Sequence, residues 1–122
     1  MVIYPEKVRR HGIAFYRSGK IDIAAPIVTL LNLQEGDVIS IVSSNGNDFY
    51  LVRRKQNAGG GYDCRVRSVN HGKYMRTYSA DLCKTMLELC NKQQIARIPC
   101  GDSITFEDYG KGVLLLTRLS YE

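Results

Sequence analysis

Two stretches of the 122-residue chain, 13–54 and 64–118, carry the same succession of predicted elements, and this repetition limits the fold more than any other feature. Each stretch opens with two short strands around a turn that contains glycine, continues with a short amphipathic helix and closes with two more strands. Small β-rich proteins reuse the same turn residues, so a chance match is the alternative. The agreement in order and type of element favours an internal duplication. The matching pieces are 17–20 with 70–73, 29–33 with 85–89, 36–41 with 101–106, and 49–54 with 113–118.

Turn and cap residues set the predicted ends of the helices. Pro26 suits the first turn of the first helix, where its missing N–H is harmless. Gly36 is expected to supply the left-handed conformation after this helix, and Ser79 to cap the start of the second helix. The two copies differ by insertions, chiefly around residues 90–100 of the second copy. The expected helices are 26–33 and 81–90, and the expected strands include 13–16, 21–23, 38–42, 49–53, 64–69 and 74–78.

Residues 56–61 divide the chain almost in half. This segment, QNAGGG, has three consecutive glycines and no bulky apolar side chain, so we expect a linker there. It would join a first copy with a basic N-terminal arm (1–55) to a second, diverged copy (62–122). One half offers about 45 residues, which is too little core to be stable alone. Either the two copies close one core within the chain, as a pseudo-dimer, or each pairs with its counterpart in a homodimer.

The formal net charge of +5 is distributed unevenly. Residues 7–20 and 53–76 together contain twelve basic residues and one acid, a charge of +11. All other residues contain five basic and eleven acidic side chains, a charge of −6. Concentrated positive charge attracts polyanions, most often nucleic acid. The alternative is that the basic residues simply decorate exposed strands.

The cysteines and histidines do not have the spacing of a metal site. No C-x-x-C occurs, and the two histidines are not near the cysteines at ligand spacing, so neither a metal nor another cofactor is expected. The thiols are expected to be reduced, with Cys83 and Cys90 packed as small hydrophobic side chains on the second helix. The remaining cysteines are Cys64 and Cys100.

No enzymatic activity is expected. Nucleophilic catalysis needs a cysteine or serine beside a positioned base, and His11 and His71 are the only histidines. The phosphate-binding motifs G-x-x-x-x-G-K-[ST] and G-x-G-x-x-G do not occur, so no small-molecule substrate is indicated. No apolar run of 18 residues exists to span a membrane, and the N-terminus has the wrong charge order for a secretory signal. A cytoplasmic location is the resulting expectation.

Two pieces of the first stretch carry a family resemblance. Residues 19–23 (GKIDI) and 31–41 (LNLQEGDVISI) resemble the segment G-[RK]-I-x-I-P-x-x-[IV]-R-x-x-L-x-L-x-x-G-D-x-[IV]-x-[IV]. The spacing between the two pieces is that of the segment, with no insertion or deletion. This segment is typical of the AbrB/MazE (SpoVT-AbrB) swapped-hairpin family of bacterial and archaeal DNA-binding proteins. The chain departs from it at Ala24, in the proline position, and at Val28, in the helix arginine position. The second copy also lacks a Gly-Asp pair directly after its helix.

The resemblance implies a mainly β fold with two short helices, a swapped-hairpin AbrB-like β-barrel formed by two tandem copies. It also implies that DNA is contacted by basic residues of the first hairpin of each copy, its turn and the adjacent arm. Phosphate contacts would dominate the affinity, and arginines in the major groove would supply any base readout. The residues that this implication singles out are Lys7, Arg9, Arg10, Arg17, Lys20, Arg65, Arg67, Lys73 and Arg76.

The leading functional hypothesis is a DNA-binding transcription regulator, with DNA as its partner. An antitoxin is a weaker alternative, because few residues follow Leu119 to wrap a toxin. A structural or assembly protein, for example of a phage particle, is the alternative from another class. It is motivated by the departures from the family segment and by the apolar residues 113–116 (VLLL). Self-association is compatible with each hypothesis.

Overall fold

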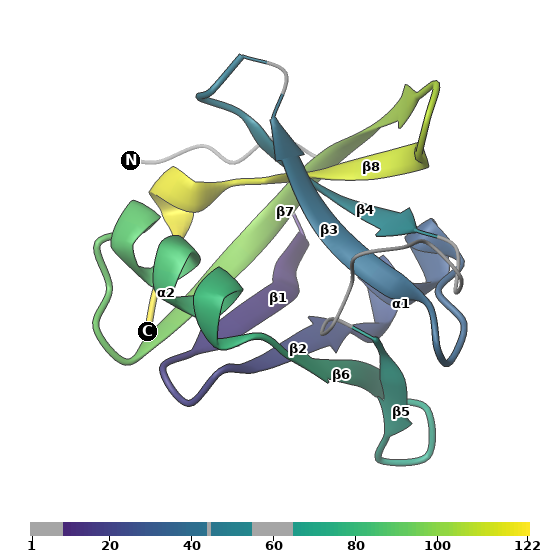
Figure 1. Cartoon of the computed structure of the whole chain (residues 1–122), viewed down its shortest axis with the longest axis horizontal. Helices are drawn as coiled ribbons and strands as arrows, with labels where there is room; N and C mark the ends of the chain where they lie inside the picture. Colours follow the sequence, from purple (N-terminus) through teal and green to yellow (C-terminus); the bar gives the residue numbers. More distant parts are fainter. Residues whose placement is uncertain (1–8, 44, 55–64) are drawn as a thin grey trace.

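A computed structural model describes residues 9–43, 45–54 and 65–122, with side chains from residue 12 onward. Within these ranges the chain forms eight strands, two α-helices and one 3-10 helix (Figure 1). The expected linker 56–61, Lys7 and Cys64 lie outside the described residues. The elements are β1 (Arg9–Tyr16), β2 (Lys20–Ala24), α1 (Ala25–Leu31), β3 (Val38–Ser43), β4 (Phe49–Arg54), β5 (Arg67–Val69), β6 (Tyr74–Tyr78), α2 (Ala80–Leu89), β7 (Ile95–Phe106), β8 (Gly110–Leu115) and η1 (Thr117–Leu119).

The eight strands form one antiparallel sheet that curls into a half-barrel (Figure 1). Its order is β3-β4-β8-β7-β1-β2-β6-β5, so the hairpin β1–β2 lies between β7 and β6. The two edges approach each other at an antiparallel bridge between Val38 and Arg65. Here the N–H of Gly36 donates to the carbonyl of Val66 at 2.8 Å, and the N–H of Val66 donates to that of Asp37 at 2.8 Å. The expected mainly β fold with two helices is confirmed.

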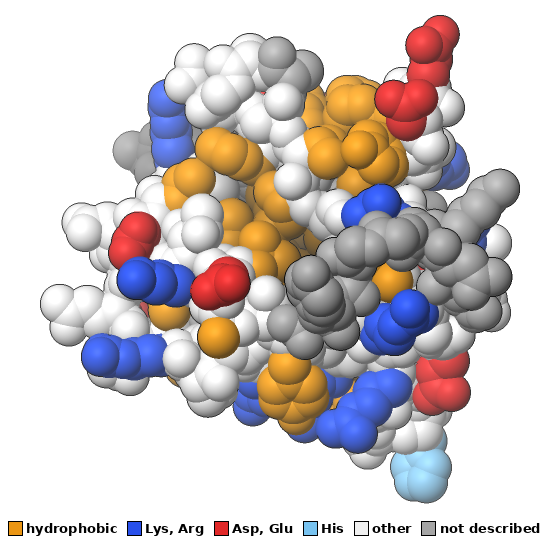
Figure 2. All heavy atoms as spheres, in the orientation of Figure 1, with side chains coloured by type: hydrophobic (Ala, Val, Ile, Leu, Met, Phe, Trp, Pro, Cys, Tyr) orange, Lys and Arg blue, Asp and Glu red, His pale blue; other side chains and the backbone are white. Residues whose placement is uncertain are grey.

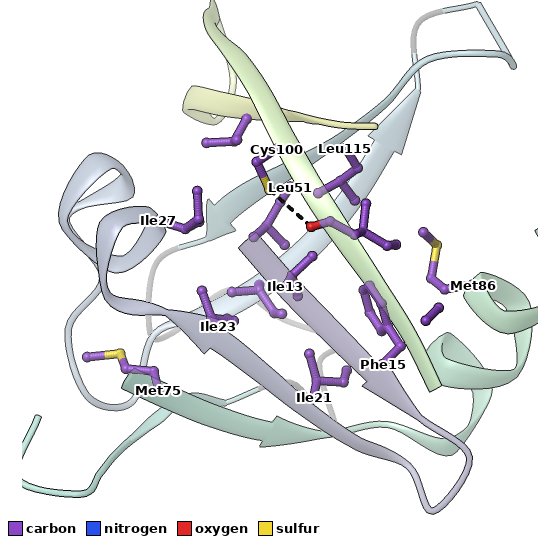
Figure 3. Packing of buried hydrophobic residues seen from close by; sticks show 14 of the residues in the cluster. Ile13, Phe15, Ile21, Ile23, Ile27, Leu51, Met75, Met86, Cys100 and Leu115 are labelled. Carbon is purple, nitrogen blue, oxygen red and sulfur yellow. Dashed lines mark hydrogen bonds between the residues drawn. The ribbon is translucent and has the colours of Figure 1, made fainter. Parts of the chain in front are cut away.

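The core forms because alternate residues of the strands are apolar. On β1 and β2, Ile13, Phe15, Ile21 and Ile23 face the concave side, and each is almost fully buried. Figure 3 shows these side chains converging with Leu51 of β4 in the interior. Helix α1 packs on β1, β2, β6 and β8, and α2 packs on β1, β2 and β7. From α2, Cys83, Met86 and Leu87 enter the same core.

The helix ends follow the expected residues except at one position. Pro26 stands in the first turn of α1, and the Ser79 hydroxyl accepts the N–H of Leu82 at 3.2 Å at the start of α2. The expectation for Gly36 is wrong: α1 ends at Leu31, and the next residue, Asn32, supplies the left-handed conformation with a φ of 52°. Asparagine tolerates this region, so the helix stops before the glycine is reached. Gly36, with φ of 88°, belongs to the turn that leads into β3.

The second half differs from its expected strands in three places. The strand expected at 64–69 is short, because Val66 bonds to the chain before β3 and only Arg67–Val69 pair with β6. Residues 90–100, expected as an insertion, contain the first half of β7, which pairs with β1. The strand expected at 113–118 is wrong at both ends: β8 is Gly110–Leu115, and η1 follows it. The N–H of Leu116 still donates to the carbonyl of Pro99 at 2.9 Å, but Pro99 has no N–H to donate in return, so the pairing with β7 stops there.

Three cysteines lie in the described part of the chain, all buried and unbridged. The expectation that Cys83 and Cys90 pack as small hydrophobic side chains is confirmed, Cys90 following directly after the last residue of α2. Cys100 donates to the carbonyl of Ile98 at 3.9 Å, as Figure 3 shows. None of the helices in the described residues is long and apolar enough to cross a membrane.

Candidate nucleic-acid interface

A row of side chains crosses the convex side of the sheet. Because successive side chains on a strand point to opposite faces, the residues that alternate with the buried ones lie on the outer side. One residue from each of five adjacent strands falls in register on this outer side. These residues carry three guanidinium groups and one carboxylate. The row reads Arg97 (β7), Ala14 (β1), Asp22 (β2), Arg76 (β6) and Arg67 (β5).

Tyrosines alternate with the cations on the same side. The Lys20 Nζ lies 4.1 Å from the ring centroid of Tyr16, on the neighbouring strand. The guanidinium of Arg67 lies 5.8 Å from the ring of Tyr78, and that of Arg76 lies 5.5 Å from the ring of Tyr74. Such cation–π contacts hold long basic side chains against the sheet while their charge stays in water.

The turn before β6 adds further positive charge through the exposed Lys73. Arg17, in the turn between β1 and β2, is also exposed but lies beside Lys84 and Glu88 of α2. Lys and Arg side chains gather over β6 and β5 along the lower part of the view in Figure 2. Within the described residues of β1, β2, β5 and β6, Asp22 is the one acidic side chain. We call this surface the basic face: Lys20, Arg67, Lys73, Arg76 and Arg97.

Asp22 is occupied by a bidentate ion pair. The Arg76 Nε donates to its Oδ1 at 2.7 Å, and the Nη2 donates to its Oδ2 at 3.2 Å. The same Nη2 donates to the hydroxyl of Tyr74 at 3.2 Å. The hydrogen bond with the carboxylate raises the pKa of Arg76 above its already high ordinary value. Arg76 therefore compensates Asp22, and the positive charge of the face comes from the other cations.

The residues singled out by the sequence fall into four groups. Four of them, Lys20, Arg67, Lys73 and Arg76, come together on the basic face. Arg17 lies beside α2 instead. Arg65 lies where the two sheet edges meet, and its Nη1 donates to the carbonyl of Gly36 at 3.4 Å. Arg9 and Arg10 are the first residues of β1, without described side chains, and Lys7 lies outside the described residues.

Arg97 belongs to the basic face and was missed in the sequence. It is the partner of Ala14 on β1, which places it in the row with Arg76 and Arg67. The signal was present in residues 95–98 (IARI), where Ala96 and Ile98 are buried and Arg97 alternates with them. Assigning 90–100 to an insertion concealed this pattern.

A hollow of about 410 Å³ lies within the basic face. It crosses β1 and β2 and reaches β6 on one side and β7 on the other. Its floor consists of short side chains, because Ala14 and Ala24 stand where neighbouring positions carry long ones. The residues around it include Gly12, Asp22, Ala25, Pro26, Lys73, Tyr74, Arg97 and Tyr121.

A second surface, on the outer side of β4, β8, the end of β7 and the turn between β7 and β8, is apolar. The ring of Tyr50 lies 5.4 Å from that of Phe106, which lies 6.4 Å from that of Tyr109. Leu114 is the partner of Tyr50 in the sheet. Ile104 is 42% exposed and Tyr109 is 39% exposed, both high for large hydrophobic residues. We call these five residues the apolar face.

The described part of the chain contains no cluster of potential metal ligands. There, no three His, Cys, Asp or Glu side chains lie together in a way that could hold an ion. No protein-family model matches the sequence, and no curated protein or solved structure matches it significantly. The function is therefore inferred from the residues of this chain.

Proposed function

We propose that the chain is a DNA-binding protein, acting as a transcription regulator, that contacts the phosphate backbone through the basic face. The observation that carries this proposal is the cross-strand row on one side of the sheet, in which Arg97 and Arg67 supply positive charge and Arg76, paired with Asp22, lies between them. Strands in a sheet are about 4.8 Å apart, so the row distributes guanidinium groups over roughly 19 Å of surface. A polyanion with regularly spaced phosphates suits such a row better than a small anion does.

The tyrosines beside the cations support nucleic acid as the polyanion. Tyr16, Tyr74 and Tyr78 lie on the same side as the basic residues, where aromatic rings are available to sugars and bases. Arg67 and Lys20 are anchored by rings and have no acidic partner among the described residues. Their charge is thus available to phosphate groups.

We further propose that the fold is a swapped-hairpin pseudo-dimer of the AbrB kind. The strand order supports this proposal. With the bridge between Val38 and Arg65 counted as the contact of β3 with β5, the strands form the ring β1-β2-β6-β5-β3-β4-β8-β7. Exchanging β1 to β4 with β5 to β8 returns the same ring, as a pseudo-two-fold axis requires. The hairpin β1–β2 also lies between two strands of the other half, as a swapped hairpin does.

The test is a fluorescence-anisotropy titration of DNA at several salt concentrations. A Lys20→Gln, Arg67→Gln, Arg97→Gln variant removes three cations of the basic face. A Lys84→Gln, Lys111→Gln, Arg118→Gln variant removes the same charge from exposed residues of α2, β8 and η1. We expect the first variant to bind weakly and the slope of log affinity against log salt to fall by about 0.9 for each phosphate that is no longer neutralised. Equal behaviour of the two variants and the wild type would contradict the proposal.

The apolar face favours a second candidate function, that of a structural or assembly protein. Large exposed apolar residues close together mark interaction surfaces in soluble proteins. Ile104 and Tyr109 lie next to Phe106 on the part of the sheet remote from the basic face. In this case, Ile104→Ser with Tyr109→Ser would release the protein from a large assembly while DNA binding, if any, stayed unchanged.

A further inference from the structure

The hollow in the basic face has an apolar floor that the sheet register explains. Ala14 is the partner of both Asp22 and Arg97, and Ala24 is the partner of Tyr74. Short side chains at these two positions leave space between the longer neighbours on every side. A volume of about 410 Å³ lies in the range of small-molecule sites, which is about 300–1,000 Å³. The hollow is therefore large enough for a planar ring system.

Each end of the hollow pairs a tyrosine with a cation. At the β6 end stand Lys73 and Tyr74, which are adjacent in the chain. At the β7 end stand Arg97 and Tyr121, held together by two backbone hydrogen bonds of 2.8 and 2.9 Å. With β1 and β2 between them, β6 and β7 are about 14 Å apart. This distance lets the two ends contact successive parts of one extended strand of nucleic acid.

The rim is electrostatically suited to phosphate. Asp22, the acidic residue beside the hollow, is compensated by its bidentate bond with Arg76. Lys73 and Arg97 have no acidic partner among the described residues. An incoming anion thus meets two available cations above a floor that offers apolar contact.

On the proposal that the protein binds DNA, we infer that the hollow binds an unpaired nucleobase, with the flanking phosphates on Lys73 and Arg97. A base has flat apolar faces that stack on tyrosine and a charged backbone that pairs with Lys and Arg. A base within an intact duplex is stacked between its neighbours and cannot enter without being extruded. The preferred ligand is therefore single-stranded or locally opened DNA.

Other ligands match only part of the hollow. A small inorganic anion would use Lys73 and Arg97 but leave the alanine floor and both tyrosines unused. An uncharged apolar compound would use the floor but leave two cations without a partner. A nucleotide strand uses both, because it combines an aromatic ring with phosphate at each repeat.

The experiment measures binding of a single-stranded DNA 12-mer and of the blunt duplex of the same sequence. Ala14→Leu fills the floor from an outward-facing strand position, and Tyr121→Ala removes one ring at an exposed position. Tyr121→Phe keeps the ring, and Thr85→Leu adds an apolar side chain on the exposed side of α2 as a matched control. Circular dichroism and thermal melting establish that each variant is folded.

We expect the wild type to bind the single strand more tightly than the duplex. Ala14→Leu and Tyr121→Ala each lower single-strand affinity by about tenfold, as loss of one stacked base does, and leave duplex affinity within twofold. Tyr121→Phe and Thr85→Leu bind as the wild type does. Single-strand affinity that is unchanged in Ala14→Leu and Tyr121→Ala overturns the inference.

The Lys20→Gln, Arg67→Gln, Arg97→Gln variant separates this inference from the proposed function. If that variant loses affinity for both DNAs while the two hollow variants do not, DNA binding stands and the base site is refuted. If the triple variant binds both DNAs as tightly as the wild type does, the proposed DNA-binding function of the basic face is refuted, whatever the hollow variants show.

Discussion

Asp22 and Arg76 join the two halves of the chain across the β2–β6 contact through two hydrogen bonds, of 2.7 and 3.2 Å. Their side chains are 19% and 21% exposed, so the pair is partly shielded from water. Arg76 is also the partner of Arg67 on β5, so two guanidinium groups stand side by side in the sheet. The carboxylate of Asp22 offsets the repulsion between them.

Replacement of Asp22 by Asn is expected to lower stability and raise DNA affinity. The free energy of unfolding should fall by about 1 kcal/mol, because the substitution removes a charge-assisted bidentate hydrogen bond from a partly solvated site. Affinity for DNA should rise, because Arg76 is released and the face no longer carries its one described strand carboxylate. Urea denaturation and anisotropy titration measure the two effects. A double-mutant cycle with Arg76→Gln isolates the pairwise energy, and a drop in stability without a rise in affinity would show that Arg76 does not meet DNA.

Gly12→Ala is expected to destabilise the protein by about 1–3 kcal/mol, because it overpacks the contact between β1 and β7. A Cβ at Gly12 would lie 2.5 Å from the Cys100 Sγ and 2.5 Å from the carbonyl oxygen of Ile98, which is backbone. Gly112→Ala is the matched comparison, since its nearest atoms belong to the Phe106 ring, at 2.5 and 3.0 Å. A half-buried ring can rotate away, so the melting temperature of Gly112→Ala should fall less. The reverse order would contradict the assigned β1–β7 packing.

Arg67→Gln should weaken DNA binding more than Arg65→Gln does. Arg67 stands in the cross-strand row, whereas Arg65 lies where the sheet edges meet and donates to the Gly36 carbonyl. Salt-dependent anisotropy should give a slope reduced by about 0.9 for Arg67→Gln and a smaller change for Arg65→Gln. Equal slopes for the two variants would show that Arg65, where the two sheet edges meet, also contacts DNA.

The sequence predicted the first half of the fold well because its signals are local. Alternating apolar residues in β1 to β4 and the turn at 17–20 act over a few positions, and the structure places these elements within a few residues of their predicted ends. The failures have non-local causes. Val66 bonds to residues before β3, and Leu116 bonds to Pro99, so distant partners decide where β5 begins and β8 ends.

The positive charge of the candidate site could be predicted from the sequence, but not all of the residues that form the site. Clusters of Lys and Arg in the sequence identified four residues of the basic face, because they lie on neighbouring hairpins. Arg97 is isolated among apolar residues, and only its pairing with Ala14 brings it to the face. The hollow could not be predicted, since it depends on Ala14 and Ala24 lying between Tyr74 and Tyr121.

Cys90 is expected to react slowly with iodoacetamide in the native protein. Burial raises the pKa of its thiol, so a smaller fraction is thiolate at any given pH. The folded state then holds a proton that the unfolded state releases, so the unfolding free energy should fall as pH rises through the ordinary thiol range. Mass spectrometry of alkylated native and guanidinium-treated protein measures the reactivity, and Cys90→Ala should remove this part of the pH dependence. Rapid native labelling at Cys90 would contradict its burial.

Fragments 1–55 and 62–122 should form a complex when mixed that is more stable than either fragment alone. Ile13 of β1 pairs with Ile98 of β7, and Leu51 of β4 pairs with Val113 of β8. Each fragment alone lacks the partners of three of its strands, because the contacts β1–β7, β2–β6 and β4–β8 all join the two halves. Circular dichroism and sedimentation of the separate and mixed fragments test this expectation. Fragments that are as stable apart as together would instead favour the homodimer arrangement of each half.

The position of the β1–β2 hairpin between β7 and β6 also determines how late in synthesis the sheet can be completed. The hairpin leaves the ribosome early, yet the strand that flanks Ile13 and Phe15 is completed only after residue 98 has been added. Until then β6 and α2 can pack against the hairpin, but β1 lacks its β7 neighbour, and nascent chains with exposed apolar surface are prone to aggregate. Folding that waits for contacts so far apart in the chain is slow in proteins of this size. The protein therefore completes its sheet only after β7 has been synthesised.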